Sequence, residues 1–344
     1  MGKDDCRLTV LMPVYNGAAF VQEALTSILE QTFSEFECLI VEDGSTDATC
    51  EILSSFRDPR IRLLRNHSNL GLARSLNKGL EAARGRYIAR MDADDLSWGH
   101  RLRAQMDFMG AHPEVGLCGA WIEVVGDGVR QVWRYPSDHD TVRTRLLFEC
   151  ALAHPVVMMN RHLLDQGRLS YDESFGAAQD YELWSRAARC CVLANLSEVL
   201  LTHRLHEEQV GQRKAAIQQV GAAKVRARLL HQMGMSPTSD EFQTHQAISS
   251  WTWGADPEFP GKANAWLQRL VHVNRHTHTY PEVILEQVVA ERWLAICQAI
   301  EGGPGSMFWS SPLSRAVDLG WKNNLQRRMW RGLSYFGLTQ IMPR

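Results

Sequence analysis

The sequence predicts an α/β fold in which a doubly wound, mainly parallel sheet is followed by a C-terminal helical extension. Up to residue 95, short apolar runs alternate strictly with helical patterns, which is typical of parallel strands joined by crossover helices. Beyond residue 210, helical patterns continue without strands and break at "SPTSDEF" (236–242). We therefore expect two domains, residues 1–210 and residues 211–344.

Each element of the first half follows from its local pattern. Apolar runs that end at turn-forming residues predict four strands, at residues 8–17, 37–47, 60–66 and 86–92. Apolar residues that recur every three or four positions predict the three helices between them, at residues 18–32, 47–56 and 71–85.

Polar side chains follow these strands at the points where they end. The clusters are Pro13-Val14-Tyr15-Asn16, Glu42-Asp43, Asn66 and Asp92-Ala93-Asp94-Asp95. Open parallel sheets bind ligands at the carboxyl ends of their strands, so we expect a site there. The chain has neither GxGxxG after its first strand nor GxxxxGK[ST] anywhere, which excludes these glycine-rich phosphate-binding loops.

The three carboxylates after the fourth strand need positive charge nearby. Asp92 and Asp94 are two residues apart, so just beyond the strand both can reach one ion. Hard oxygen ligands suit Mg²⁺ or Mn²⁺, which leave coordination positions for phosphate oxygens. The alternative interpretation is a solvated turn or a helix cap, with Asp95 turning the chain towards the helix that contains Arg101.

Composition narrows the classes of function. A formal net charge of -2 gives no reason to expect nucleic-acid binding. The eight cysteines are scattered and the N-terminus is polar, so we expect reduced thiols and a cytoplasmic protein. No apolar run approaches the ~18 residues that would span a bilayer.

Six blocks of the sequence carry a resemblance. They are "PVYNG" (13–17), "VEDGSTDAT" (41–49), "NLGLARSLNKGLEAARGRYIARMDADD" (69–95), "HPVVM" (154–158), "QDYELWSRA" (179–187) and "HRLH" (203–206). In this order and spacing, residues 7–210 resemble the family 2 glycosyltransferases with the GT-A fold. The resemblance implies an inverting, metal-dependent enzyme. Such an enzyme moves a sugar from a nucleotide-diphospho-sugar, most often a UDP-sugar, to a glycan or lipid-linked glycan.

The resemblance assigns the first two blocks to the nucleotide base. Pro13, Val14 and Tyr15 would hold the base, and the carboxylate of Asp43 would accept a hydrogen bond from a ring N–H. A local turn at "DGST" closed by Asp43 is the alternative for that residue.

The resemblance assigns the charged part of the donor to later residues. Arg74 would approach the base or the phosphates, Asp92 would contact the ribose or the metal shell, and Asp94 would coordinate a metal on the diphosphate. His206 would be a further metal or diphosphate ligand, with a purely structural histidine as the alternative. His203 stands where the family usually has an aromatic residue.

Inversion requires a base on the sugar face opposite the leaving group, and the resemblance assigns Asp180 to this role. The alternative for Asp180 is an N-cap of the helix that follows it. Gln179 stands where the family usually has a second acid, so Asp180 lacks a like-charged neighbour that would raise its pKa. His154 would line the acceptor side, and a buried structural histidine is the alternative.

Two expectations remain open. The alternative to an enzyme is a non-catalytic sugar- or nucleotide-binding scaffold derived from a glycosyltransferase. Residues 313–344 carry six basic residues against one acidic residue, with apolar residues at helical spacing. This pattern predicts either peripheral contact with an anionic membrane at its cytoplasmic face or a helix docked on the protein's own apolar surface.

Overall fold

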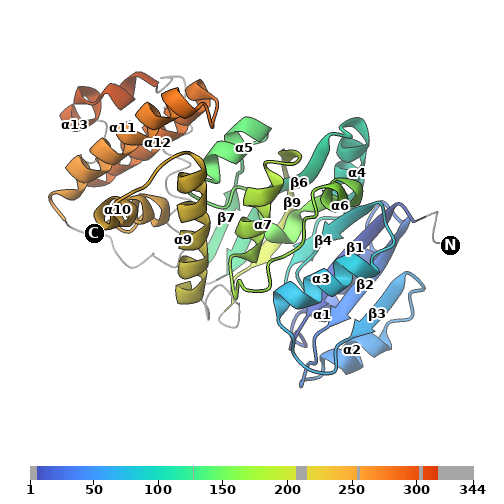
Figure 1. Ribbon diagram of the computed structural model, residues 1–344. Helices are drawn as coiled ribbons and strands as arrows, with labels where there is room; N and C mark the ends of the chain where they lie inside the picture. Colours follow the sequence, from blue (N-terminus) through green and yellow to red (C-terminus); the bar gives the residue numbers. More distant parts are fainter. Residues whose placement is uncertain (1–5, 127, 207–214, 254–255, 302–304, 317–344) are drawn as a thin grey trace. The chain divides into compact units, whose positions relative to one another are not determined.

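The structure, a computed structural model, describes residues 6–126, 128–206, 215–253, 256–301 and 305–316 (Figure 1). The chain divides into two compact units. Unit 1 combines residues 1–139 with 152–221, and unit 2 combines residues 140–151 with 222–344. The division at 210/211 stays a prediction about domains, and nothing in the sequence indicated that residues 140–151 would group with the C-terminal part.

Unit 1 contains a nine-stranded sheet with the order β3-β2-β1-β4-β8-β6-β9-β5, and β7 pairs with β6. The strands are β1 Leu8–Val14, β2 Phe36–Glu42, β3 Ile61–Arg65, β4 Tyr87–Arg90, β5 Leu96–Ser97, β6 Val115–Gly126, β7 Val129–Trp133, β8 Met158–Asn160 and β9 Val192–Arg204. The four predicted strands are confirmed as β1 to β4 and pair in parallel. Strand β8 lies antiparallel between β4 and β6, while β6 and β9 are again parallel. The predicted α/β class with a mainly parallel sheet is therefore confirmed.

The helices of unit 1 lie between its strands along the chain. They are α1 Val21–Leu29, α2 Thr49–Ser55, α3 Leu72–Ala82, α4 Arg101–Ala111, η1 His154–Val156, α6 Arg161–Gln166 and α7 Gln179–Ala187. The three predicted crossover helices are confirmed as α1, α2 and α3. Every residue of β1 is buried, as expected for a central strand covered on both faces. The carboxyl ends of β1, β2 and β4 consequently lie at one edge of the sheet.

Unit 2 is helical in its described part, as predicted. Its elements are α5 His139–Arg145, α10 Ser239–Ser250, α11 Phe259–Thr277, α12 Glu282–Glu301, α13 Ser306–Ser310 and η2 Pro312–Ala316, and α9 Ala215–Gln232 runs from unit 1 into unit 2. The expected break at 236–242 is wrong in one respect, because α10 begins inside it. Thr238 and Glu241 exchange side-chain-to-backbone hydrogen bonds there, which form a capping box.

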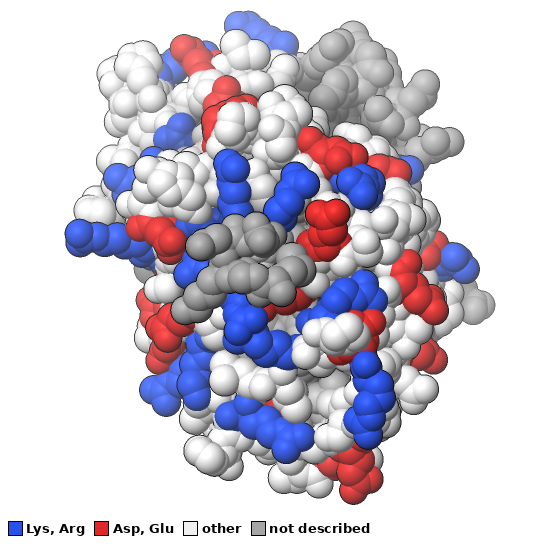
Figure 2. Space-filling view, turned by 90° about the vertical axis from the view of Figure 1, so that its right-hand side faces the viewer, with Lys and Arg blue, Asp and Glu red and all other residues white. Residues whose placement is uncertain are grey.

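The surface and the C-terminal segment add two observations. Basic and acidic side chains are interspersed on the face shown in Figure 2. Within the described ranges, no helix combines the length and apolar character needed to cross a membrane. Of residues 313–344 the structure describes only 313–316, so all the basic residues behind the membrane-surface prediction except Arg315 lie outside the described part.

Candidate functional site

Asp43, directly after β2, is a buried carboxylate at the carboxyl edge of the sheet. It is 3% exposed. Its Oδ1 accepts from Asn66 Nδ2 at 2.8 Å and from the N–H of Leu70 at 2.9 Å, and its Oδ2 accepts from the N–H of Gly71 at 2.9 Å. An ionised carboxylate can accept about four hydrogen bonds, so these three leave capacity for one more donor.

The turn after β2 is tied to the loop after β1. Asn16 Oδ1 accepts from the N–H of Thr46 at 2.8 Å, and the N–H of Asn16 donates to Ser45 Oγ at 3.0 Å. Glu42 accepts from the N–H of Ser45. The alternative in which Asp43 closes a type I turn here is wrong, because Gly44 has a positive φ and the Asp43 carboxylate bonds residues after β3 instead. Gly44 has a φ of +71°, and a Cβ there would lie 2.6 Å from backbone carbon, which only glycine avoids.

Pro13, Val14 and Tyr15 form the end of β1 and the start of its loop, at the same edge. Pro13 and Val14 are buried and pair with β2. Tyr15 is 48% exposed, so its ring is available to stack on a flat ligand. The structure therefore brings these residues together with Asp43, and their contact with a base stays a prediction.

Asp92 follows β4 and pairs with a buried arginine. The two terminal nitrogens of Arg90 bond the two carboxylate oxygens of Asp92. Arg90 is 1% exposed, and its planar guanidinium matches a carboxylate at two points. Arg90, the last residue of β4, therefore supplies part of the positive charge that we expected near these carboxylates. This residue was not identified from the sequence.

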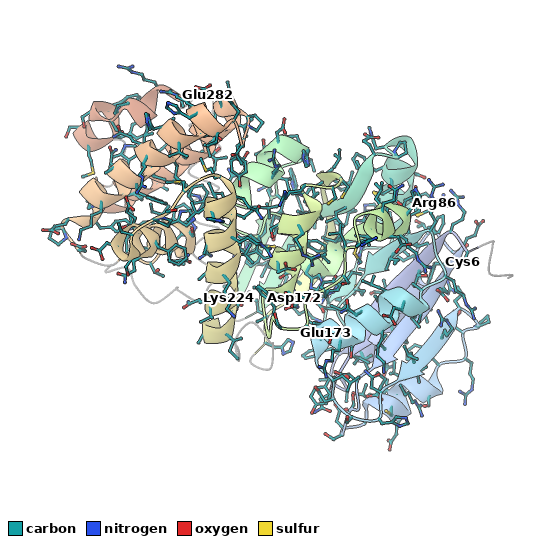
Figure 3. The ribbon with its side chains drawn as sticks, viewed as in Figure 1. Cys6, Arg86, Asp172, Glu173, Lys224 and Glu282 are labelled. Atoms are coloured by element: carbon teal, nitrogen blue, oxygen red, sulfur yellow. The ribbon has the colours of Figure 1, made fainter. Side chains whose placement is uncertain are left out.

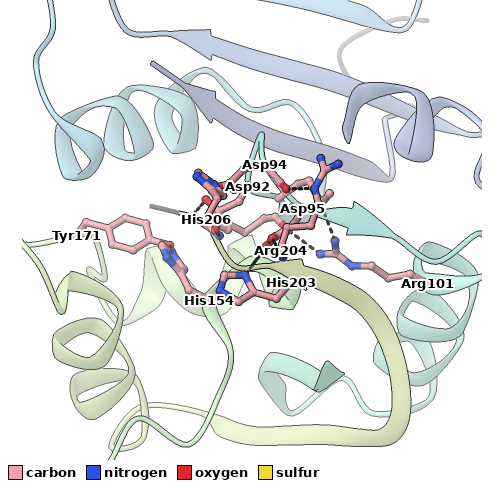
Figure 4. Close-up of polar contacts among 11 residues, drawn as sticks. Asp92, Asp94, Asp95, Arg101, His154, Tyr171, His203, Arg204 and His206 are labelled. Atoms are coloured by element: carbon pink, nitrogen blue, oxygen red, sulfur yellow. Dashed lines mark hydrogen bonds and ion pairs between the residues drawn. The ribbon is translucent and has the colours of Figure 1, made fainter. Parts of the chain in front are cut away.

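Asp94 lies against the predicted ligand His206 (Figure 4). Asp94 Oδ2 and His206 Nε2 are 3.0 Å apart. The ring centroids of His206 and Phe20 lie 4.5 Å apart, so the imidazole is packed in place. The predicted pairing of Asp94 with His206 in space is thus present, although 112 residues separate them in the chain.

Asp95 is fully buried and holds the end of β9. It accepts from the N–H of Arg204 at 3.1 Å, and its Oδ1 lies 2.9 Å from His203 Nδ1. The expected cap role of Asp95 is wrong, because its carboxylate bonds β9 and the residue that caps α4 is His100. Burial alone would lower the pKa of His203, but Asp95, with Asp94 and Asp92, raises it to about 9. His203 is therefore a cation at neutral pH.

The donor set fits a hard divalent cation. The carboxylates of Asp92, Asp94 and Asp95 present ligand atoms within 4.8 Å of one another. Asp92 and Asp95 are engaged by charged partners, whereas Asp94 faces the imidazole of His206. Asp94 and His206 are therefore the residues that would hold an ion, which stays a prediction. Nδ1 of His206 is buried with no hydrogen-bond partner among the described residues.

Arg74 pairs with a carboxylate of this chain, and its contact with a base or a phosphate stays a prediction. Its Nε donates to Glu173 at 2.8 Å, and Figure 3 marks Glu173 in the loop before α7. From the next turn of α3, Asn77 binds the same loop, donating to the carbonyl of Tyr171 and accepting from its N–H, both at 2.9 Å. Helix α3 thus positions the loop that leads to α7.

Asp180 is the second residue of α7. The N-cap is Ala178, which has a φ of 61°, so the N-cap alternative for Asp180 is wrong. Burial raises the pKa of Asp180, while the N–H of Tyr181 and the charge of Arg90 lower it in part. The pKa of Asp180 is therefore raised even though residue 179 is a glutamine and not a second acid, because burial causes the shift. A partly buried carboxylate of raised pKa is suited to accept a proton.

His154 takes the structural role given as the alternative. It is 8% exposed, and its Nε2 lies 2.9 Å from the hydroxyl of Tyr171. Trp184 of α7 packs edge-on against it at 5.9 Å between ring centroids. Burial and the charge of Arg90 hold the pKa of His154 well below its usual value, so the ring is neutral.

Comparison with known proteins identifies the family. The sequence model described as "Glycosyl transferase family 2" matches residues 9–166. An uncharacterized glycosyltransferase of Methanocaldococcus jannaschii is 30% identical over 206 residues, which are 58% of this chain and 70% of that protein. The chain belongs to the family 2 glycosyltransferases.

Two further similarities concern this glycosyltransferase. An Escherichia coli protein named UDP-Glc:alpha-D-GlcNAc-diphosphoundecaprenol beta-1,3-glucosyltransferase WfgD is 29% identical over 181 residues, 53% of this chain and 69% of that one. The crystal structure of S. aureus TarS 1-349 in complex with UDP-GlcNAc has a TM-score of 0.58 at 17% identity and covers 96% of this chain and 91% of that chain. At this identity the likeness of the glycosyltransferase to TarS establishes the fold.

Sequence reasoning missed several residues that organise the site of the glycosyltransferase. Arg90 carried a signal, because an arginine between Ala89 and Met91 in an otherwise apolar strand has to be paired if it is buried. Asn77 and Tyr171 carried none, since their contact joins residues 94 apart in the chain.

Proposed function

We propose that this glycosyltransferase moves a sugar from a UDP-sugar to a hydroxyl of a glycan or lipid-linked glycan, with inversion at the anomeric carbon. The observation that carries the proposal is the cluster of Asp92, Asp94 and Asp95 at the carboxyl edge of the sheet. The buried Asp43 lies at the same edge, and the half-buried Asp180, whose pKa burial raises, would be the base. The names of the E. coli relative and of the TarS complex support a UDP-sugar donor, and the E. coli name supports a lipid-linked acceptor.

In this proposal, side chains already held in place by the protein recognise the nucleotide of the donor. Asp43 is held rigid by three hydrogen bonds and would accept from the N–H of the base, while Tyr15 would stack on it. Arg74 would exchange Glu173 for a phosphate or the base, which its exposed position permits. Rigid partners lower the ordering cost of binding.

Asp94 and His206 would hold Mn²⁺ or Mg²⁺ on the diphosphate. When bound, such an ion supplies charge that stabilises the departing nucleoside diphosphate. The imidazolium of His203, fixed by Asp95, adds positive charge from the protein beside the same cluster.

Asp180 would act on the acceptor. The acceptor oxygen forms a bond to the anomeric carbon, the bond from that carbon to the diphosphate oxygen breaks, and the hydroxyl proton passes to Asp180. The pair of electrons from the broken bond leaves with the nucleoside diphosphate. Because attack and departure occur on opposite faces, the configuration inverts.

A donor-hydrolysis and transfer screen over nucleotide sugars tests the proposal. Released UDP with an inverted product, assigned by NMR of the anomeric proton, is the expected result. A product of retained configuration would contradict the mechanism. Nucleotide binding without turnover for any donor or acceptor would instead favour the non-catalytic scaffold.

We also propose that residues 313–344 attach the protein peripherally to anionic membrane at its cytoplasmic face. The surplus of basic residues supports this, and each contributes about 1 kcal/mol near such a surface, so attachment would be reversible and salt-sensitive. The full chain should sediment with anionic vesicles at low salt and not at high salt. A variant with Arg327, Arg328 and Arg331 replaced by Gln should bind less, and equal binding of both proteins would contradict the proposal.

A further inference from the structure

Arg90 is a fully buried cation at the centre of the site. It lies on β4 and is 1% exposed, and its terminal nitrogens bond both oxygens of Asp92. Its Nε is buried and has no hydrogen-bond partner within the described part of the chain. The fork to Asp92 is therefore the side-chain interaction that holds this guanidinium.

The main chain of Arg90 is fixed from two sides. Its N–H donates to the carbonyl of Val157 at 2.9 Å, and its carbonyl accepts from Arg101 Nη2 at 2.6 Å. Arg101 is itself fully buried and bonds Gln105 at 3.1 Å. Because its backbone is held in this way, Arg90 presents a fixed two-point partner to the carboxylate of Asp92.

This arrangement has a consequence for what Asp92 can bind. A two-point contact with a guanidinium occupies one acceptor position on each carboxylate oxygen, and the remaining positions face away from the arginine. Asp92 is also 27% exposed at its side chain, whereas Arg90 is 2% exposed, so the outward side of the carboxylate is the accessible one. An oriented, charged acceptor of this kind suits a hydroxyl donor.

We propose that Arg90 is a positioning residue for the donor, which aims the outward oxygen positions of Asp92 at a ribose hydroxyl of the nucleotide. This inference rests on the proposed use of a UDP-sugar. Lysine cannot replace arginine in this role, because an ammonium is a single point charge without the planar two-point geometry. Arg90→Lys therefore keeps the charge and removes the orientation.

The chain offers a matched control. Arg62 makes the same kind of two-point contact with Glu37, at 3.0 and 3.3 Å. Glu37 is the second residue of β2 and pairs with Thr9, the second residue of β1, so this fork lies at the amino ends of the strands, away from the carboxyl edge. Arg62→Lys makes the identical chemical change outside the site.

The experiment measures the affinity of the full chain for UDP, 2′-deoxy-UDP and 3′-deoxy-UDP by calorimetry with Mn²⁺. The starting protein should prefer UDP over one of the deoxy forms by about tenfold, as expected for a hydrogen bond to a charged acceptor. Arg90→Lys should bring that preference below about threefold, and Arg62→Lys should keep it. A purely structural Arg90 would lower the folded fraction and leave the ratio unchanged.

The remaining outcomes of the affinity measurement also test the role of Arg90. If Arg90→Lys retains the preference, the positioning role is overturned while the proposed function stands. If the starting protein binds no UDP, the proposed function fails first and the inference with it. Should Arg90→Lys fail to fold by circular dichroism, Arg90→Gln is measured in its place. Its side chain has one donor nitrogen and cannot make the two-point contact, so its preference for UDP should also fall below about threefold.

Discussion

Each unit of the molecule contains a buried cluster of charges, and the two clusters differ in balance. In unit 2, Arg145 and Arg292 share Glu149, and Arg145 also pairs with Glu291, so two cations meet two carboxylates. In unit 1, Asp92 pairs with Arg90, and Asp95 pairs with His203. The third carboxylate, Asp94, pairs with the imidazole of His206.

This difference in charge balance distinguishes a cluster that stabilises the fold from a cluster suited to bind a ligand. Burial alone would raise the pKa of Glu149, but Arg292 and Arg145 lower it to about 2, so this cluster is electrostatically complete. Among the described residues, Asp94 in the cluster of unit 1 pairs with an imidazole and not with a guanidinium, and such a carboxylate is suited to a cation that arrives with a ligand. The contrast predicts that changes in unit 1 affect activity and changes in unit 2 affect stability.

The largest expected effect is that of Asp180→Asn on turnover. An amide cannot take the acceptor proton, so kcat should fall by about 10²–10⁴-fold while donor binding is kept. Transfer rates and calorimetric UDP affinity, measured on the same preparation, check both halves. A variant that transfers at the original rate would show that another group is the base.

The next effect concerns stability in unit 2. Within the described ranges, Glu149→Gln leaves buried Arg292 with no paired carboxylate. This should reduce the free energy of unfolding by about 3 kcal/mol, with kcat per folded molecule unchanged. Since the pKa of Glu149 is lowered to about 2 from 4.5, its contribution is complete above pH 4.5 and is lost as the pH falls through 2.

The control for that variant is Glu258→Gln. Glu258 pairs with Lys262 at 3.1 Å, with side chains 76% and 49% exposed. Exposed pairs of this kind contribute little to stability because water and salt screen them, so urea unfolding should separate the two variants. Equal losses would mean that burial does not distinguish the pairs.

The smallest expected effect is a shift in the pH dependence of kcat/KM. Burial raises the pKa of Asp180, and the ionised form is the active one, so kcat/KM should rise with pH along a limb above the usual value of about 3.9. The profile is measured with circular dichroism at each pH to confirm folding. A limb at or below the usual value would contradict the burial argument.

Much of the fold and part of the site could be predicted because they depend on local order. Strands β1 to β4 and helices α1 to α3 carry their own periodicity, and the carboxyl-edge rule placed Asp43 and Asp94 at one edge. The pairing of Asp94 with His206 came from the family resemblance.

The remainder depends on contacts between distant parts of the chain. The bonds of Asp43 to Leu70 and Gly71, and the hold of Asn77 on Tyr171, exist only once the strands are assembled. The same is true of residues 140–151, whose grouping with unit 2 follows from packing. Arg90 is different, since its place in an apolar strand was visible in the sequence.

In the proposed mechanism, Asp94 and His206 would hold a divalent cation and a nucleoside diphosphate together. The direct measurement is calorimetric titration of UDP into the full chain and into Asp94→Asn, each with and without Mn²⁺. The account predicts that Mn²⁺ strengthens UDP binding by at least about tenfold in the starting protein and has little effect in Asp94→Asn. Equal strengthening by Mn²⁺ in both proteins, or none in the starting protein, would contradict it.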